Sequence, residues 1–129
     1  MLLRVMINEN LYLAEHFRTL CEKHGVATYE HPECRPYAYP PLRKVHTHPV
    51  VDEKTYAQAL HELGHVVLRH SPDQPRAWKE LLAWRWARAN SIILWTPGME
   101  AFEAWALGTW GMTLNADPAI VVRAFHQAA

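Results

Sequence analysis

The chain has 129 residues, a length at which one modest hydrophobic core is usual, so we expect a single domain over residues 1–129. Half of the residues are hydrophobic and a fifth are charged, a composition typical of a globular chain and not of a disordered one. The 13 basic and 13 acidic residues cancel without forming a basic block, which gives no sign of direct nucleic-acid binding.

The same bulk features indicate a compartment. No apolar run approaches the roughly 20 residues needed to cross a bilayer, and the short apolar N-terminus lacks the basic start and cleavage site of a signal peptide. Cys21 and Cys34 are too few for a disulfide framework. We therefore expect a cytoplasmic protein that does not enter a membrane.

The predicted elements before residue 50 are one helix and two extended segments. Apolar residues spaced three and four apart predict an amphipathic helix over residues 11–23, which Gly25 ends. Residues 26–29 have the pattern of a short strand, whereas four prolines between residues 31 and 41 predict an irregular surface loop. Residues 43–50 alternate as a strand does, and their proline predicts a place at the edge of a sheet.

The second part of the chain predicts four helices, each opened by a capping residue or a proline. They cover residues 53–70 after Asp52, 75–90 from Pro75, 97–110 after Thr96 and 118–127 after Asp117. Together with the short strands near the front, they predict an α+β fold that is mostly helical.

The helix predicted over residues 53–70 carries the motif His61-Glu62-Leu63-Gly64-His65. Histidines four residues apart lie about 40° apart around a helix, so both imidazoles can bind one metal ion. Glu62 lies about 100° around the helix axis from His61, where its carboxylate can contact a metal-bound water without binding the metal. Zinc would lower the pKa of that water to about 7, and Glu62 would act as general base in amide hydrolysis.

The surroundings of the motif strengthen this interpretation. The rest of the helix is largely apolar, and two histidines and a glutamate buried there without partners would be costly. The alternative to a metal site is that these three polar residues form a stripe that faces solvent.

A catalytic zinc site needs a third protein ligand and an open fourth position. His70 is the nearest candidate, but on a continuous helix it lies on the wrong side. The longer H-E-x-x-H-x-x-G-x-x-H pattern is also absent, because Leu68 and Ser71 stand at its glycine and histidine positions. We interpret His70 as a cation at the helix end, favoured by the helix dipole.

Among the carboxylates, Glu80 is the best placed third ligand. A short proline-containing turn brings the start of the next helix back past the end of the first. Ala83 and Ala87 share a helix face with Glu80, and such small residues let two backbones approach closely. Three alternatives stay open. The third ligand could be Glu100 or Glu103 instead, or Glu80 could simply be an acid in the first turn of its helix that faces solvent.

Two stretches of the chain also resemble a known family, the ImmA/IrrE-like metallopeptidases, a gluzincin-type group common in phages and mobile elements. The first stretch resembles the zinc helix of that family and reads Ala59-Leu60-His61-Glu62-Leu63-Gly64-His65-Val66-Val67-Leu68-Arg69-His70. The second resembles its following helix and reads Glu80-Leu81-Leu82-Ala83-Trp84-Arg85-Trp86-Ala87. The resemblance covers roughly residues 43–97, and the 14 residues between His65 and Glu80 are fewer than many members have.

This resemblance carries implications of its own. It implies a zincin-like fold with His61, His65 and Glu80 as zinc ligands and Glu62 as general base. It also implies that residues 43–50 form a strand beside the substrate cleft. The partner would be a protein or peptide substrate, in many members a repressor or another regulator.

Weaker patterns lie outside the motif. His46 and His48 are two apart on a predicted strand, so both would point to one face, where they line the cleft and hold an oxyanion or simply face solvent. Tyr56 has a similar pair of interpretations. The six tryptophans could form an aromatic cleft, but core filling is favoured for a small domain, and they are Trp78, Trp84, Trp86, Trp95, Trp105 and Trp110.

The sequence thus predicts a zinc-dependent peptidase that hydrolyses a peptide bond in a protein partner, with Glu62 as the base. The alternative is a zincin-like module that holds zinc and regulates a partner by contact without turnover. A helical protein without metal is a third possibility.

Overall fold

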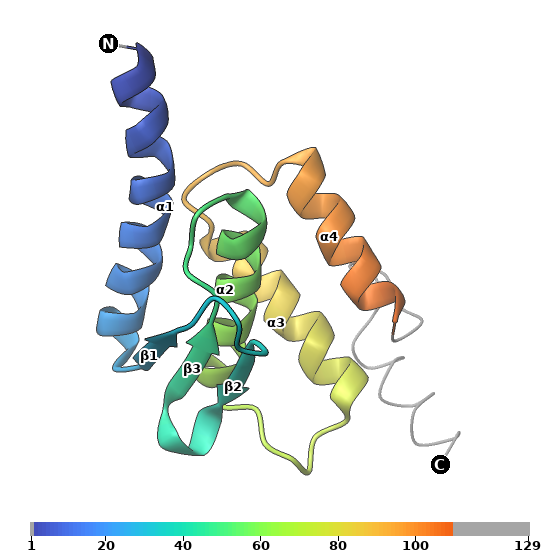
Figure 1. Ribbon diagram of the computed structural model, residues 1–129. Helices are drawn as coiled ribbons and strands as arrows, with labels where there is room; N and C mark the ends of the chain where they lie inside the picture. Colours follow the sequence, from blue (N-terminus) through green and yellow to red (C-terminus); the bar gives the residue numbers. More distant parts are fainter. Residues whose placement is uncertain (1, 110–129) are drawn as a thin grey trace.

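The computed structural model describes residues 2–109 of the chain, and side chains from residue 10 onward. Its elements are α1 (Leu2–His24), β1 (Ala27–Glu30), β2 (Tyr37–Tyr39), a 3-10 turn (Pro40–Leu42), β3 (Lys44–Thr47), α2 (Glu53–Val67), α3 (Arg76–Asn90) and α4 (Pro97–Gly108). The class is α+β and mostly helical, as predicted. In Figure 1, α2 lies between α1 and the sheet on one side and α3 and α4 on the other, and it contacts all of them.

The first helix is longer than predicted but ends as predicted. α1 begins at Leu2 rather than residue 11, and it ends where Gly25 adopts a positive φ of 66°. The Val26 N–H donates to the Cys21 carbonyl at 2.8 Å, which closes the helix end. Of the expected amphipathic stripe, Leu11 is exposed, and the rest is buried and consists of Leu13, Ala14, Phe17, Leu20 and Cys21.

The sheet differs from the prediction in its order. β3 lies in the centre, with β1 parallel on one side and β2 antiparallel on the other. The predicted edge position for residues 43–50 is therefore wrong. The strand ends at Thr47, so Pro49 lies beyond the hydrogen-bonded ladder and does not interrupt it.

The edge strand β2 lies within the segment predicted to be irregular. Pro36 precedes its three residues and Pro40 follows them, so the prolines bracket the strand. An edge strand of three residues needs few ladder hydrogen bonds, which is why a proline-rich segment can supply it. The loop prediction was wrong at this point.

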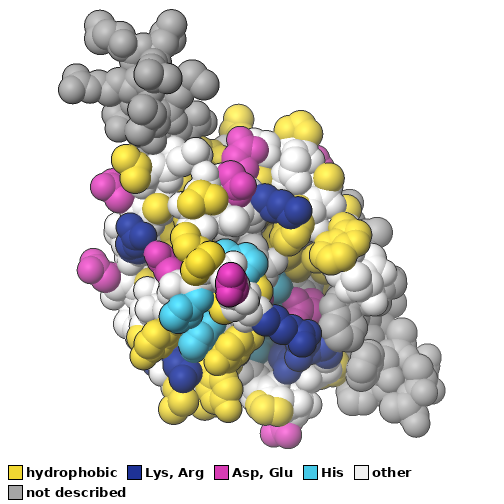
Figure 2. Space-filling view, viewed as in Figure 1, with side chains coloured by type: hydrophobic (Ala, Val, Ile, Leu, Met, Phe, Trp, Pro, Cys, Tyr) yellow, Lys and Arg dark blue, Asp and Glu magenta, His cyan; other side chains and the backbone are white. Residues whose placement is uncertain are grey.

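The two faces of the sheet have different roles. Val45 and Thr47 of β3 are fully buried on the inner face. On the outer face, the His46 ring stacks between Tyr29 and Tyr37, with ring centroids 4.9 and 4.6 Å apart. Figure 2 shows histidine and apolar side chains gathered over this part of the surface. His46 therefore belongs to an outer aromatic layer.

The caps of the later helices follow the sequence closely. The Asp52 carboxylate accepts from the Thr55 N–H at 2.8 Å, and the Thr55 hydroxyl accepts from the Asp52 N–H, which forms a capping box. Pro75 precedes α3, and the Thr96 hydroxyl accepts from the Met99 N–H at the start of α4. The helix predicted over residues 118–127 lies outside the described residues.

Tyr56 ties several elements together within the core. Its ring is fully buried, and its hydroxyl accepts from the Ile92 N–H at 2.9 Å and lies 2.7 Å from His16 Nδ1. Trp84 is likewise buried, as expected of a core filler, whereas Trp105 is 67% exposed. None of the described helices is long and apolar enough to cross a membrane.

Candidate metal centre

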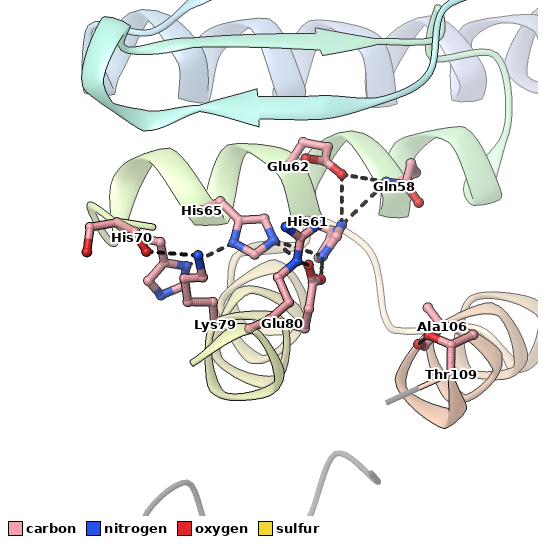
Figure 3. Close-up of polar contacts among 11 residues, drawn as sticks. Gln58, His61, Glu62, His65, His70, Lys79, Glu80, Ala106 and Thr109 are labelled. Carbon is pink, nitrogen blue, oxygen red and sulfur yellow. Dashed lines mark hydrogen bonds and ion pairs between the residues drawn. The ribbon is translucent and has the colours of Figure 1, made fainter. Parts of the chain in front are cut away.

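Three side chains from two helices converge at one point. His61 and His65 reach down from α2, and Glu80 reaches up from α3 (Figure 3). The His61 Nε2 atom lies 3.2 Å from His65 Nε2 and 2.6 Å from Glu80 Oε2, and the His65 Nε2 to Glu80 Oε2 distance is 3.4 Å. Within the described part of the chain, this is the one group of three such residues that could hold a metal ion.

These distances can be compared with what zinc requires. Two atoms bonded to zinc at about 2.0–2.1 Å and tetrahedral angles lie about 3.4 Å apart. The separations of 3.2 and 3.4 Å meet this requirement, and the 2.6 Å between His61 and Glu80 is that of a charge-assisted hydrogen bond. Two imidazoles and a carboxylate are also a usual donor set for zinc. The group therefore fits a zinc ion once the His61 Nε2 and Glu80 Oε2 atoms move slightly apart.

The electrostatics of the group favour a charged pair at the short contact between His61 and Glu80. Burial alone would lower the pKa of His61, but the carboxylates of Glu62 and Glu80 raise that pKa to about 9. Burial alone would raise the pKa of Glu80, but hydrogen bonds from the two histidines hold it well below its usual range. Metal binding at His61 Nε2 would require that atom to be free of a proton, so the affinity of the group for a metal would depend on pH.

The close approach of the two helices depends on Gly64. A Cβ atom at this position would lie 3.0 Å from the Ala83 carbonyl oxygen and 3.2 Å from the Trp86 ring. The backbones of α2 and α3 are thus nearly in contact one turn after Glu80, as the small residues Ala83 and Ala87 predicted. The role of Gly64 was missed, although a glycine inside a buried helix, which costs about 1 kcal/mol against alanine, is itself a signal of close packing.

Trp84 fixes the plane of the His61 ring. The two rings stack with centroids 4.3 Å apart and planes inclined by 14°. Trp84 lies on the same helix as Glu80, so α3 supplies both the carboxylate and the support for its histidine partner.

His70 corrects the sequence prediction. α2 ends at Val67, and Arg69 adopts a left-handed φ of 56°, so the chain turns back instead of continuing around the helix. The Arg69 N–H donates to the Val66 carbonyl and the His70 N–H to the His65 carbonyl, which is the pattern of a Schellman motif. This turn buries His70 and places its Nδ1 atom 2.9 Å from His65 Nδ1.

The buried environment of His70 disfavours the predicted role as a cation. Burial, followed by the charge of His65, lowers the pKa of His70 to about 4, so the ring is neutral near pH 7. If His65 Nε2 bound a metal, its Nδ1 would carry the ring proton and could donate a hydrogen bond to His70 Nδ1. His70 would then orient a metal ligand, as second-layer partners of metal sites do.

The candidate base, Glu62, is held by a neighbour that sequence reasoning missed. Its Oε1 atom accepts from Gln58 Nε2 at 2.9 Å and lies 3.3 Å from His61 Nδ1 (Figure 3). Gln58 stands one helical turn before Glu62, and the spacing of four residues was the available signal. The carboxylate lies beside the metal group but is not one of its three members.

Glu80 has a second partner that leaves one oxygen for the metal. Arg76, one turn earlier on α3, donates from Nε to Glu80 Oε1 at 3.2 Å, while Oε2 faces the histidines. The arginine also neutralises part of the buried negative charge. Sequence reasoning did not assign a role to Arg76.

The other candidates lie elsewhere. Glu100 is exposed and lies 3.7 Å from Arg88, and Glu103 is buried on α4 at 3.5 Å from the same arginine. His48 contacts the Cys34 carbonyl, with Nε2 2.6 Å from the oxygen. Neither His48 nor His46 lines the cleft beside the metal group, where the sequence had offered them as oxyanion ligands.

A cleft of about 620 Å³ opens beside His65 and Glu80. Glu62, His65 and Glu80 line its base, β2 and its flanking prolines form one wall, and the start of α3 forms the other. The strand beside the cleft is thus β2, and not residues 43–50 as the family resemblance implied. A bound metal at the group would be open to this space.

Comparison with known proteins adds no identity. No family model matches the chain, and no curated protein or solved structure matches it either.

Proposed function

We propose that this chain is a zinc-dependent peptidase of the ImmA/IrrE-like, zincin-like type, which hydrolyses a peptide bond in a protein partner in the cytoplasm. One observation carries the proposal. His65 and Glu80, two members of a group of three zinc-type ligands, line an open cleft, and the buried carboxylate of Glu62, which is not part of the group, lines the same cleft. Structural zinc sites are usually closed by four protein ligands, whereas catalytic sites have three and an open position.

Each residue has a task in this mechanism. His61, His65 and Glu80 would hold the zinc ion, which would supply an acidified water and polarise the scissile carbonyl. Glu62 accepts the proton of the attacking water and later delivers it to the leaving amine, as a general base and then a general acid. Gln58 holds the Glu62 carboxylate in place, and burial strengthens the electrostatic interactions within the site.

The cleft also suits an extended peptide. Among residues 2–109, β2 pairs with β3 and with no other strand, so its other edge has backbone N–H and C=O groups that can pair with a further strand. Tyr37 and Tyr39 of this strand line the cleft. A peptide bound along β2 would pass the metal group, which supports a peptide as the substrate.

The test is a pair of variants measured for both zinc content and peptide cleavage. Glu62→Gln should retain one zinc per chain and lose cleavage by about a hundredfold or more, because the amide cannot accept a proton. His61→Ala should lose both zinc and cleavage. Glu100→Gln, an exposed acid outside the site, serves as the matched control.

Full cleavage by Glu62→Gln would overturn the assignment of the base. If wild type retains zinc, binds its partner and shows no cleavage of any peptide in a library, the chain is a zinc-holding module that acts by contact.

A further inference from the structure

We infer that the cleft selects peptides that carry acidic residues next to the scissile bond. This inference rests on the proposed function and names the substrate class of the same site. The cleft is lined by three basic side chains, Arg35, Arg76 and Lys79. The acidic residues among its lining are Glu62 and Glu80, and the site itself uses both.

The three cations come from opposite walls. Arg35 precedes β2 on the sheet side, where it is exposed, and Arg76 and Lys79 lie in the first turns of α3. Lys79 is held in place, because its ammonium donates to the Ser71 carbonyl at 2.8 Å. Figure 2 shows Lys and Arg side chains gathered between the sheet and α3, with His and acidic side chains set deeper behind them. Positive charge thus flanks the metal group on both sides.

The charge of the cleft contrasts with that of the whole chain. With a zinc ion bound, its two positive charges and those of the three cations outweigh Glu62 and Glu80, which leaves a formal charge of +3. The chain as a whole has a net charge of zero. The positive end of the α3 dipole lies at the same wall and adds to the potential.

A positive cleft with apolar walls should attract and orient an anionic segment. Pro36, Tyr37, Tyr39 and Pro40 line the cleft together with the cations, and low-dielectric walls concentrate an electrostatic field. Carboxylates of Asp or Glu in an extended peptide can pair with guanidinium and ammonium groups while the peptide bond between them lies at the metal. A basic peptide would meet the repulsion of the same groups.

The experiment measures binding separately from cleavage. Zinc-loaded Glu62→Gln is titrated against two fluorescent peptides that are identical except that Glu residues replace Gln around the central bond. The acidic peptide should bind about tenfold more tightly at low salt, and the preference should shrink at high salt because screening weakens the attraction. Arg35→Gln should reduce the preference by about threefold, because a pair at an exposed rim contributes modestly. Arg35→Lys should restore most of it.

The control is Lys23→Gln, an exposed cation at the end of α1, which should leave the preference unchanged. Equal affinity of the two peptides would overturn the inference. So would tight binding of a single-stranded oligonucleotide that displaces the acidic peptide, since the cleft would then be a nucleic-acid site. Cleavage by wild type without a charge preference would sink this inference and spare the proposed function. Charge-selective binding without cleavage would contradict the proposed function and leave the charge preference of the cleft standing.

Discussion

Two buried glutamates show how differently the fold treats the same side chain. Glu80 on α3 and Glu103 on α4 are 7% and 2% exposed. Glu80 receives hydrogen bonds from two histidines and Arg76, and its pKa lies well below the usual range. Burial raises the pKa of Glu103 to about 7, because Arg88 at 3.5 Å offsets it only in part and Glu100 adds repulsion. Burial alone therefore does not mark a functional acid, whereas converging donors do.

The largest effect expected from this contrast is on zinc binding. Glu80→Gln removes a charged ligand and should weaken zinc binding by about a hundredfold or more, beyond the tenfold to hundredfold usual for second-layer residues. Glu103→Gln should leave the affinity unchanged. Competition with a chromophoric chelator measures both, and equal losses in the two variants would remove the distinction between these acids.

Measuring stability as a function of pH tests the raised pKa of Glu103. Because the pKa of Glu103 is raised from 4.5 to about 7 on folding, its contribution to stability is complete below pH 4.5 and is lost as pH rises through about 7. Glu103→Gln should remove this loss and raise the free energy of unfolding at pH 8 by about 3 kcal/mol. Urea unfolding of the zinc-free protein at pH 5 and 8 measures it. An unchanged pH dependence would show that Glu103 is not the titrating group.

The contact between α2 and α3 offers a third way to sharpen the contrast, because it brings Glu80 to the histidines. Gly64→Ala places a Cβ 3.0 Å from the Ala83 carbonyl oxygen and should cost about 2 kcal/mol of stability. It should also weaken zinc binding. Gly98→Ala on α4 is the matched control, since its Cβ would meet its nearest neighbour, the Thr96 hydroxyl oxygen, at 3.9 Å. If both variants behave alike, the close helix approach is not required.

The smallest effect concerns the support of His65. His70→Phe keeps a ring beside Trp78 but removes the acceptor for His65 Nδ1, and should weaken zinc binding about tenfold. His24→Phe, outside the site, should leave it unchanged. The readout is zinc affinity together with circular dichroism to confirm folding. No change in affinity would mean that His65 needs no second-layer partner.

The sequence was most informative where interactions are local. Asp52 and the apolar spacing located α2, the spacing of four residues put His61 and His65 on one face, and the short turn with Ala83 pointed to Glu80. Each of these inferences depends on neighbours within one or two helical turns or across one tight connection. That is the range over which spacing and capping residues fix geometry.

Long-range pairing was not predictable in the same way. The central place of β3 and the strand β2 depend on register between segments, which local patterns do not encode. The position of His70 depended on a left-handed Arg69, at a position where glycine or asparagine is the usual sequence signal. Gln58 and Arg76 are different, because each stands four residues before its glutamate partner, a local spacing that could have indicated both contacts.

The most direct test of the account is anomalous X-ray diffraction at the zinc edge from crystals of the protein purified without chelator. The account predicts one zinc ion per chain, bound by His61 Nε2, His65 Nε2 and Glu80 Oε2, with Glu62 beside the ion and not bound to it. A zinc ion held by a fourth protein ligand, or none at this group, would contradict it.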